Sequence, residues 1–164
     1  AFEKWNDWDA DLFDKVEESL LKKITDFQYD IFGYDKAPSA VAKAKDNARN
    51  ANLDDYIKIE QRNFFETEKE TEGTLHMVFN PPYGERLDID LERFYREIGD
   101  TLKQSYPDTN AWFITGNIEA LKYVGLKPSR KIKLFNGKLE ARLVKYEMYK
   151  GSKRTKFQNK TENE

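Results

Sequence analysis

Hydrophobic positions along the chain change period several times, and the changes outline alternating helices and strands. From residue 9 to about residue 26, apolar side chains recur every three or four residues, which predicts an amphipathic helix. An Ala-rich stretch predicts a helix over residues 39–50, and apolar spacing predicts helices over residues 91–102 and 118–124, the last ended by Gly125. Short apolar runs predict strands; they cover residues 29–34, 56–60, 75–79 and 111–115.

The last two apolar runs, residues 131–135 and 139–149, flank Asn136-Gly137. This dipeptide is a strong hairpin signal, so the two runs are expected to pair antiparallel. Strands that alternate with helices indicate an α/β fold, with a mostly parallel sheet covered by helices and an antiparallel hairpin at its edge. Residues 1–150 are expected to form one domain, and the polar, basic tail at residues 151–164 is expected to be disordered.

Composition excludes several kinds of site. The 164 residues include no Cys and one His, His76, so a disulfide framework, a cysteine nucleophile and a thiolate metal site are all excluded. A cytosolic compartment fits this composition, and no apolar run is long enough for a membrane span. The net charge of −2 argues against an autonomous RNA-binding module, but not against a catalytic domain whose substrate is held by a separate domain.

Candidate chemistry gathers at Asn80-Pro81-Pro82-Tyr83, which follows the strand predicted at residues 75–79. Open α/β sheets bind their ligands at the carboxyl ends of strands. There the Asn80 amide oxygen and the Pro81 carbonyl would accept hydrogen bonds from an exocyclic base amine, and Tyr83 would stack on the base. The alternative is structural: two prolines that end a strand, followed by a packed aromatic residue.

The extended motif Phe79-Asn-Pro-Pro-Tyr-Gly-Glu-Arg-Leu87 resembles the bacterial large-subunit rRNA guanine-N2 methyltransferases that carry a THUMP domain. These are S-adenosylmethionine-dependent enzymes of the Asn-Pro-Pro-Tyr class. The resemblance continues through Ala1-Phe-Glu-Lys-Trp5, Gly33-Tyr-Asp35 and Arg62-Asn-Phe-Phe65, and fades after Gly151. It implies a Rossmann-like class I fold, S-adenosylmethionine as the cofactor, and ribosomal RNA as a partner held through a separate RNA-binding domain.

The resemblance also assigns roles to individual residues. Asp35 would accept hydrogen bonds from the cofactor ribose, and Asn63 and Phe64 would contact the adenine, although the family usually has Asp in place of Asn63. Asn80 to Tyr83 would form the catalytic turn, with Asn80 also near the cofactor, and the following Glu85 and Arg86 would contact the guanine edge and RNA phosphate. Each role has a purely structural alternative: Asp35 could be an ordinary turn residue, Phe64 could be part of the core, and Glu85 and Arg86 could form an exposed ion pair.

One family feature is missing from this sequence. A glycine-rich loop should follow the first strand of the fold, but the first glycine here is Gly33, in what the resemblance makes the second strand. The chain is therefore expected to be a catalytic-domain fragment with weak or absent cofactor binding and with exposed strand edges open to self-association. Adenine-N6 methylation of DNA or RNA, and a non-catalytic scaffold that has lost the loop, remain alternatives.

Overall fold

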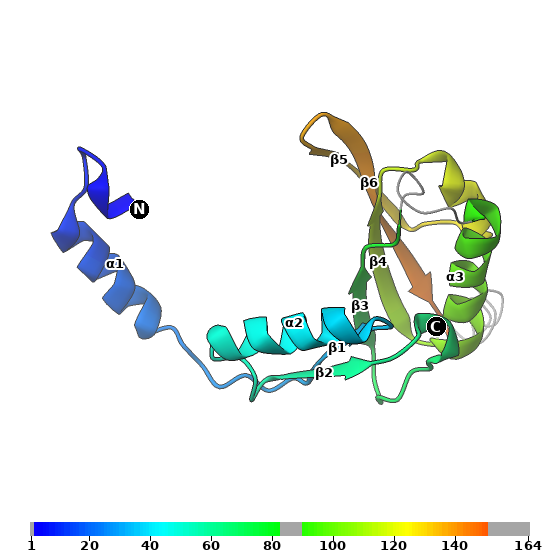
Figure 1. Cartoon of the computed structure of the whole chain (residues 1–164), viewed down its shortest axis with the longest axis horizontal. Helices are drawn as coiled ribbons and strands as arrows, with labels where there is room; N and C mark the ends of the chain where they lie inside the picture. Colours follow the sequence, from blue (N-terminus) through cyan, green and yellow to red (C-terminus); the bar gives the residue numbers. More distant parts are fainter. Residues whose placement is uncertain (1, 83–89, 151–164) are drawn as a thin grey trace, which may run out of the picture. The chain divides into compact units, whose positions relative to one another are not determined.

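The computed structural model describes residues 2–82 and 90–150 (Figure 1). The chain divides into two compact units, Ala1–Gln61 and Arg62–Glu164.

The first unit contains a parallel strand pair joined by a helix. Strand β1 (Ile31–Asp35) pairs with β2 (Ile57–Gln61), and helix α2 (Pro38–Asn50) connects them. Pro38 opens α2, where the missing amide hydrogen of proline costs nothing. The α2 side chains of Val41 and Ala48 are buried, so the predicted strand, helix and strand are confirmed, with boundaries shifted by one or two residues.

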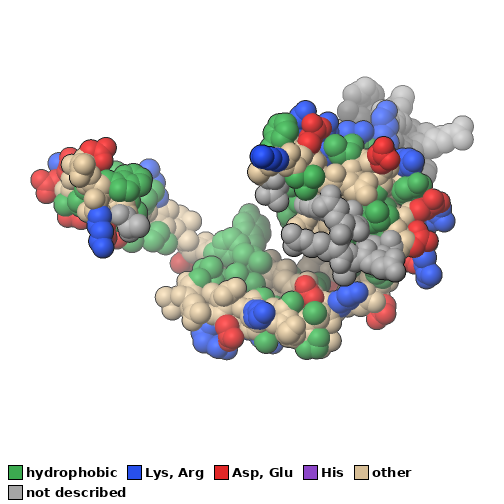
Figure 2. All heavy atoms as spheres, turned by 45° about the horizontal axis from the view of Figure 1, so that its top comes forward, with side chains coloured by type: hydrophobic (Ala, Val, Ile, Leu, Met, Phe, Trp, Pro, Cys, Tyr) green, Lys and Arg blue, Asp and Glu red, His purple; other side chains and the backbone are tan. Residues whose placement is uncertain are grey.

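Helix α1 (Ala10–Leu21) precedes this pair and follows the short 3₁₀ turn η1 (Phe2–Lys4). The Asp9 carboxylate caps α1, because Oδ1 accepts a hydrogen bond from the Leu12 amide at 2.9 Å. The helix ends at Leu21, five residues before the predicted end; Ile24 and Thr25 are β-branched and favour a helix weakly. Its apolar stripe stays exposed between the charged side chains (Figure 2).

The second unit contains a four-stranded sheet in the order β3-β4-β6-β5. Its strands are β3 (Leu75–Phe79), β4 (Thr109–Thr115), β5 (Arg130–Asn136) and β6 (Leu139–Met148). Strand β3 runs parallel to β4, whereas β6 is antiparallel to both β4 and β5. Together with the parallel β1–β2 pair, this sheet confirms an α/β fold that combines parallel strands with an antiparallel hairpin.

Helix α3 (Leu91–Ser105) and the 3₁₀ segment η3 (Glu119–Val124) pack together and supply much of the core of this unit. The short turn η2 (Phe64–Glu66) adds aromatic side chains to it. The largest fully buried side chains come from α3 and the sheet: Tyr95, Ile98, Leu102, Phe113, Val144 and Tyr146. Contact between α3 and η3 is very close, because a Cβ at Gly99 would lie 1.8 Å from the Val124 carbonyl oxygen.

Two glycines allow the chain to turn in this unit. Gly125 ends η3 with φ +65°, as the sequence predicts. In the β5–β6 hairpin Asn136 pairs with Leu139, so the two turn residues are Gly137 and Lys138. The hairpin is confirmed, but Asn136 is the last residue of β5, and only Gly137 of the Asn-Gly signal forms the turn.

Four strands have an unpaired edge within the described residues. β1 and β2 pair only with each other, β3 pairs only with β4, and β5 pairs only with β6. Self-association through such edges stays a prediction. No helix among residues 2–82 and 90–150 has the length and apolar character needed to cross a membrane.

Candidate functional site

The turn after β3 begins at Asn80, directly behind the last strand residue, Phe79. Asn80 is exposed, Pro81 is buried and Pro82 is half-buried. The Asn80 side chain makes no hydrogen bond to another described residue, and the Pro81 carbonyl is in no strand pair. Among the described residues, neither oxygen has a hydrogen-bond donor, so both could accept from a ligand. Tyr83, Glu85 and Arg86 lie outside the described residues.

Aromatic packing joins the end of β3 to the turn that follows β2. The Phe64 ring stacks on Phe79, with centroids 5.4 Å apart and an angle of 30°, and on Tyr106, at 5.8 Å and 15°. Because Phe79 directly precedes Asn80, this packing brings the predicted adenine-binding turn and the Asn-Pro-Pro turn together. Phe64 thus has a core-packing role, and its contact with adenine stays a prediction.

Asn63 holds the η2 turn. Its Nδ2 donates to Glu66 Oε1 at 2.7 Å, and its Oδ1 accepts a long bond from the Phe65 amide at 3.4 Å. A carboxylate at this position could not donate to Glu66, which explains in local terms why Asn suits this turn. The half-buried Asn63 side chain is thereby fixed beside the stacked rings, while its adenine contact is untested.

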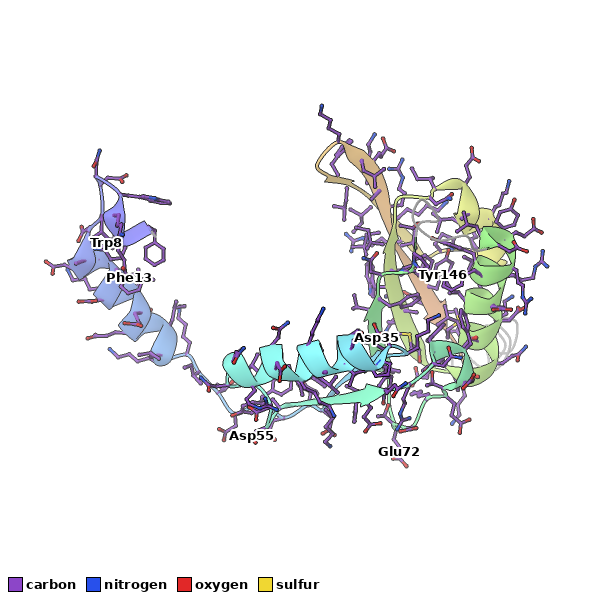
Figure 3. The ribbon with its side chains drawn as sticks, in the orientation of Figure 1. Trp8, Phe13, Asp35, Asp55, Glu72 and Tyr146 are labelled. Carbon is purple, nitrogen blue, oxygen red and sulfur yellow. The ribbon has the colours of Figure 1, made fainter. Side chains whose placement is uncertain are left out.

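Asp35 is the last residue of β1 and begins the turn into α2 (Figure 3). Its Oδ1 accepts a hydrogen bond from the Ala37 amide at 2.7 Å. Oδ2 has no partner among the described residues, and the residue is exposed. Asp35 Oδ1 therefore stabilises the turn, as the structural alternative expects. Among the described residues Oδ2 is available to a hydroxyl donor such as a ribose.

The carboxyl end of β4 carries polar groups that sequence reasoning missed. Thr115 Oγ1 lies 2.6 Å from the Tyr95 hydroxyl and accepts from the Asn117 amide at 3.0 Å. Asn117 Oδ1 accepts from the Ala120 amide at 3.1 Å, which starts η3. Since β3 and β4 are parallel, with Phe79 opposite Phe113, this turn lies at the same rim as Asn80. The sequence Thr115-Gly-Asn117, which directly follows a predicted strand, could have indicated a polar turn here.

This rim combines acceptors that have no donor among the described residues with packed aromatic rings beneath them. Among the described residues there is no cluster of three or more His, Asp or Glu side chains suited to a metal ion. The arrangement suits a reaction in which the protein orients two reactants rather than one that proceeds through a protein nucleophile.

A family profile described as the RMKL-like methyltransferase domain matches residues 5–145. A ribosomal RNA large subunit methyltransferase K/L from Hahella chejuensis is 34% identical over 157 residues, which cover 90% of this chain and 22% of that protein. The crystal structure of SMU.472, assigned as a methyltransferase and complexed with SAH, matches 93% of this chain and 41% of its own, with 30% identity and a TM-score of 0.79.

A structure from Listeria monocytogenes named as a predicted N6-adenine-specific DNA methylase is 30% identical, with a TM-score of 0.61, over 72% of this chain and 30% of its own. The chain thus spans about a fifth of the length of the curated methyltransferase and less than half of either solved chain.

Proposed function

We propose that this chain, which belongs to the RMKL-like methyltransferase domain family, is the greater part of a catalytic domain that methylates an exocyclic amine of a base in ribosomal RNA. The most specific form of the proposal is guanine N2 in the large subunit. The carrying observation is the Asn80-Pro81-Pro82 turn at the carboxyl rim of the sheet, whose acceptors have no donor among the described residues. The name of the Hahella relative, a ribosomal RNA methyltransferase, supports RNA as the substrate class.

The acceptors at the rim suit the amine of a flipped base. Asn80 Oδ1 and the Pro81 carbonyl would accept its N–H groups and so direct the nitrogen lone pair away from the turn. Pro81 is buried, and stacking of Phe64 on Phe79 supports the strand end just before it, so the acceptors are preorganised. Tyr83 would stack on the base.

The described residues also fit S-adenosylmethionine, which supplies an electrophilic methyl group when bound. Asp35 has one free carboxylate oxygen for a ribose hydroxyl, and Asn63 is held in place beside Phe64 for the adenine. The bound SAH of the SMU.472 structure supports this cofactor class. The bound cofactor would supply the methyl group and leave as S-adenosylhomocysteine, so no covalent enzyme intermediate would be needed. Asn80 and Pro81 would orient the base amine, whose proton would pass to solvent.

The direct test is methyl transfer by the complete gene product that contains this sequence. We expect tritium from labelled S-adenosylmethionine to enter large-subunit rRNA as N2-methylguanosine, and Asn80→Ala to abolish most of this transfer while the protein stays folded. Asn110→Ala, a half-buried asparagine at the opposite end of the sheet, is the matched control. If the product were N6-methyladenosine, the substrate base would be adenine and not guanine. If no methyl group were transferred to any nucleic acid, the non-catalytic scaffold would be supported.

A further inference from the structure

A basic cleft lies in the second unit, beside the carboxyl rim that carries Asn80. It has a volume of about 790 Å³ and is formed by η3, the connector after it, and strands β5 and β6. Four of its lining residues are cations and one is acidic: Lys122, Lys127, Lys131, Arg142 and Glu119. This concentration of positive charge contrasts with the net charge of −2 on the chain as a whole.

The sheet register explains why cations from separate strands meet in this cleft. Arg142 lies opposite Thr115 at the end of β4, and Lys131 lies opposite Val144. Residues directly opposite one another in an antiparallel pair point to the same face, and so do alternate residues along a strand. Arg142 and Lys131 therefore share the face of Val144 and Tyr146, the face that α3 and η3 cover.

Two cations of the cleft, Lys127 and Lys131, have no ion pair to a described residue, and a third, Arg142, shares its carboxylate partner with another lysine. Arg142 pairs with Glu140 at 2.6 Å, but Lys133 pairs with the other Glu140 oxygen, also at 2.6 Å, so one carboxylate serves two cations. Lys127 and Lys131 are exposed and have no ion pair to a described residue. Exposed, unpaired lysines are the groups that release counterions when they contact phosphate.

The rest of the lining is apolar, with side chains of Ile118, Leu121, Leu126, Pro128 and Tyr146. The cations come from η3, the connector after it and two strands, and apolar side chains lie among them. They match an extended polyanion whose sugars and bases pack between its charges.

We propose that this cleft binds the phosphate backbone of the RNA strand whose base enters the Asn80 turn. The inference rests on the proposed function, because that function supplies the RNA. It assigns Lys122, Lys127, Lys131 and Arg142 to RNA positioning rather than to methyl transfer. They hold the strand by charge, and the Asn80 turn then selects the amine.

The test is binding of a short fluorescein-labelled oligouridine to the 164-residue chain, measured by fluorescence anisotropy over a series of KCl concentrations. We expect Lys127→Gln/Lys131→Gln to weaken binding and to lower the slope of log affinity against log salt by about 0.7 for each cation removed. Arg130→Gln/Lys138→Gln makes the same change in net charge. It lies outside the cleft, since Arg130 is on the other face of β5 and Lys138 is in the hairpin turn, and it should leave the slope almost unchanged.

Equal loss of slope in both double variants would overturn the proposal, as would no change in the cleft variant or no binding by the unmodified chain. Lys122→Gln provides an independent variant on η3 with the same expectation. Binding needs no methyl transfer, so the two hypotheses fail separately. If the cleft binds RNA but Asn80→Ala transfers methyl groups at the unmodified rate, the proposed function is refuted and the cleft stands. Normal methylation at limiting RNA by the cleft variant refutes the cleft.

Discussion

The Tyr146 hydroxyl is a buried polar group without a hydrogen-bond partner among the described residues. The residue lies fully buried on β6, where its ring stacks on Phe113 with centroids 5.5 Å apart and an angle of 17° (Figure 3). A buried hydroxyl that lacks a partner costs about 1–3 kcal/mol of stability. Tyr146→Phe removes this cost and keeps the stacked ring.

We expect Tyr146→Phe to raise the free energy of unfolding by about 1 kcal/mol, the lower end of that range, and Tm by about 2–4 °C. Urea unfolding followed by circular dichroism measures the first quantity. Tyr95→Phe is the matched control, since its hydroxyl lies 2.6 Å from Thr115 Oγ1. That variant should instead lose about 0.5–1.5 kcal/mol.

Alkaline pH gives a second measurement on the same residue. Burial, with a smaller contribution from Tyr95, raises the pKa of Tyr146 to about 12. Because the folded-state pKa is raised above the ordinary value of about 10, ionisation of Tyr146 does not affect stability below pH 10. As pH rises from 10 toward 12, the unfolded chain ionises first and the free energy of unfolding falls. The difference between Tyr146→Phe and the unmodified protein should grow by at most about 1.4 kcal/mol per pH unit in this range. A less stable Tyr146→Phe protein at neutral pH would refute the reasoning, because it would mean that water in the adjacent cleft satisfies the hydroxyl.

Two further predictions concern packing and cofactor binding. Gly99→Ala should lower the free energy of unfolding by about 1–3 kcal/mol or more, because the new methyl group would lie 1.8 Å from the Val124 carbonyl oxygen. A Tm equal to that of the unmodified protein would contradict this prediction. Calorimetric titration of S-adenosylmethionine into the 164-residue chain should show weak or absent binding, since the sequence has no glycine-rich loop before Gly33 to approach the methionine portion, and a micromolar Kd would refute this prediction.

Much of the fold could be predicted from hydrophobic period, because the core of the second unit imposes that period. Strand β3 has the predicted limits, and Gly125 ends η3 as expected. Helix α1 was predicted too long; among the described residues its apolar side chains, such as Leu12 and Leu20, stay exposed. Local signals, namely the helix propensity of each residue and the Asp9 cap, then determine where the helix begins and ends.

The candidate site was predictable where its chemistry is contiguous in sequence, as in Asn80-Pro81-Pro82. Its support was not, because the stack of Phe64 on Phe79 and Tyr106 joins segments far apart in the chain. The basic cleft could not be predicted either, because its lining residues also come from segments far apart in the chain. Arg142 and Lys131 meet only through strand register, and a net charge of −2 conceals them.

The central claim is tested most directly by mapping the methyl group that the complete gene product transfers to large-subunit rRNA. We predict N2-methylguanosine in the digested rRNA, present with the unmodified protein and with Asn110→Ala, and nearly lost with Asn80→Ala. Transfer by the Asn80→Ala protein at the unmodified rate would contradict the account, because the unused acceptors at the end of β3 would then have no part in the reaction.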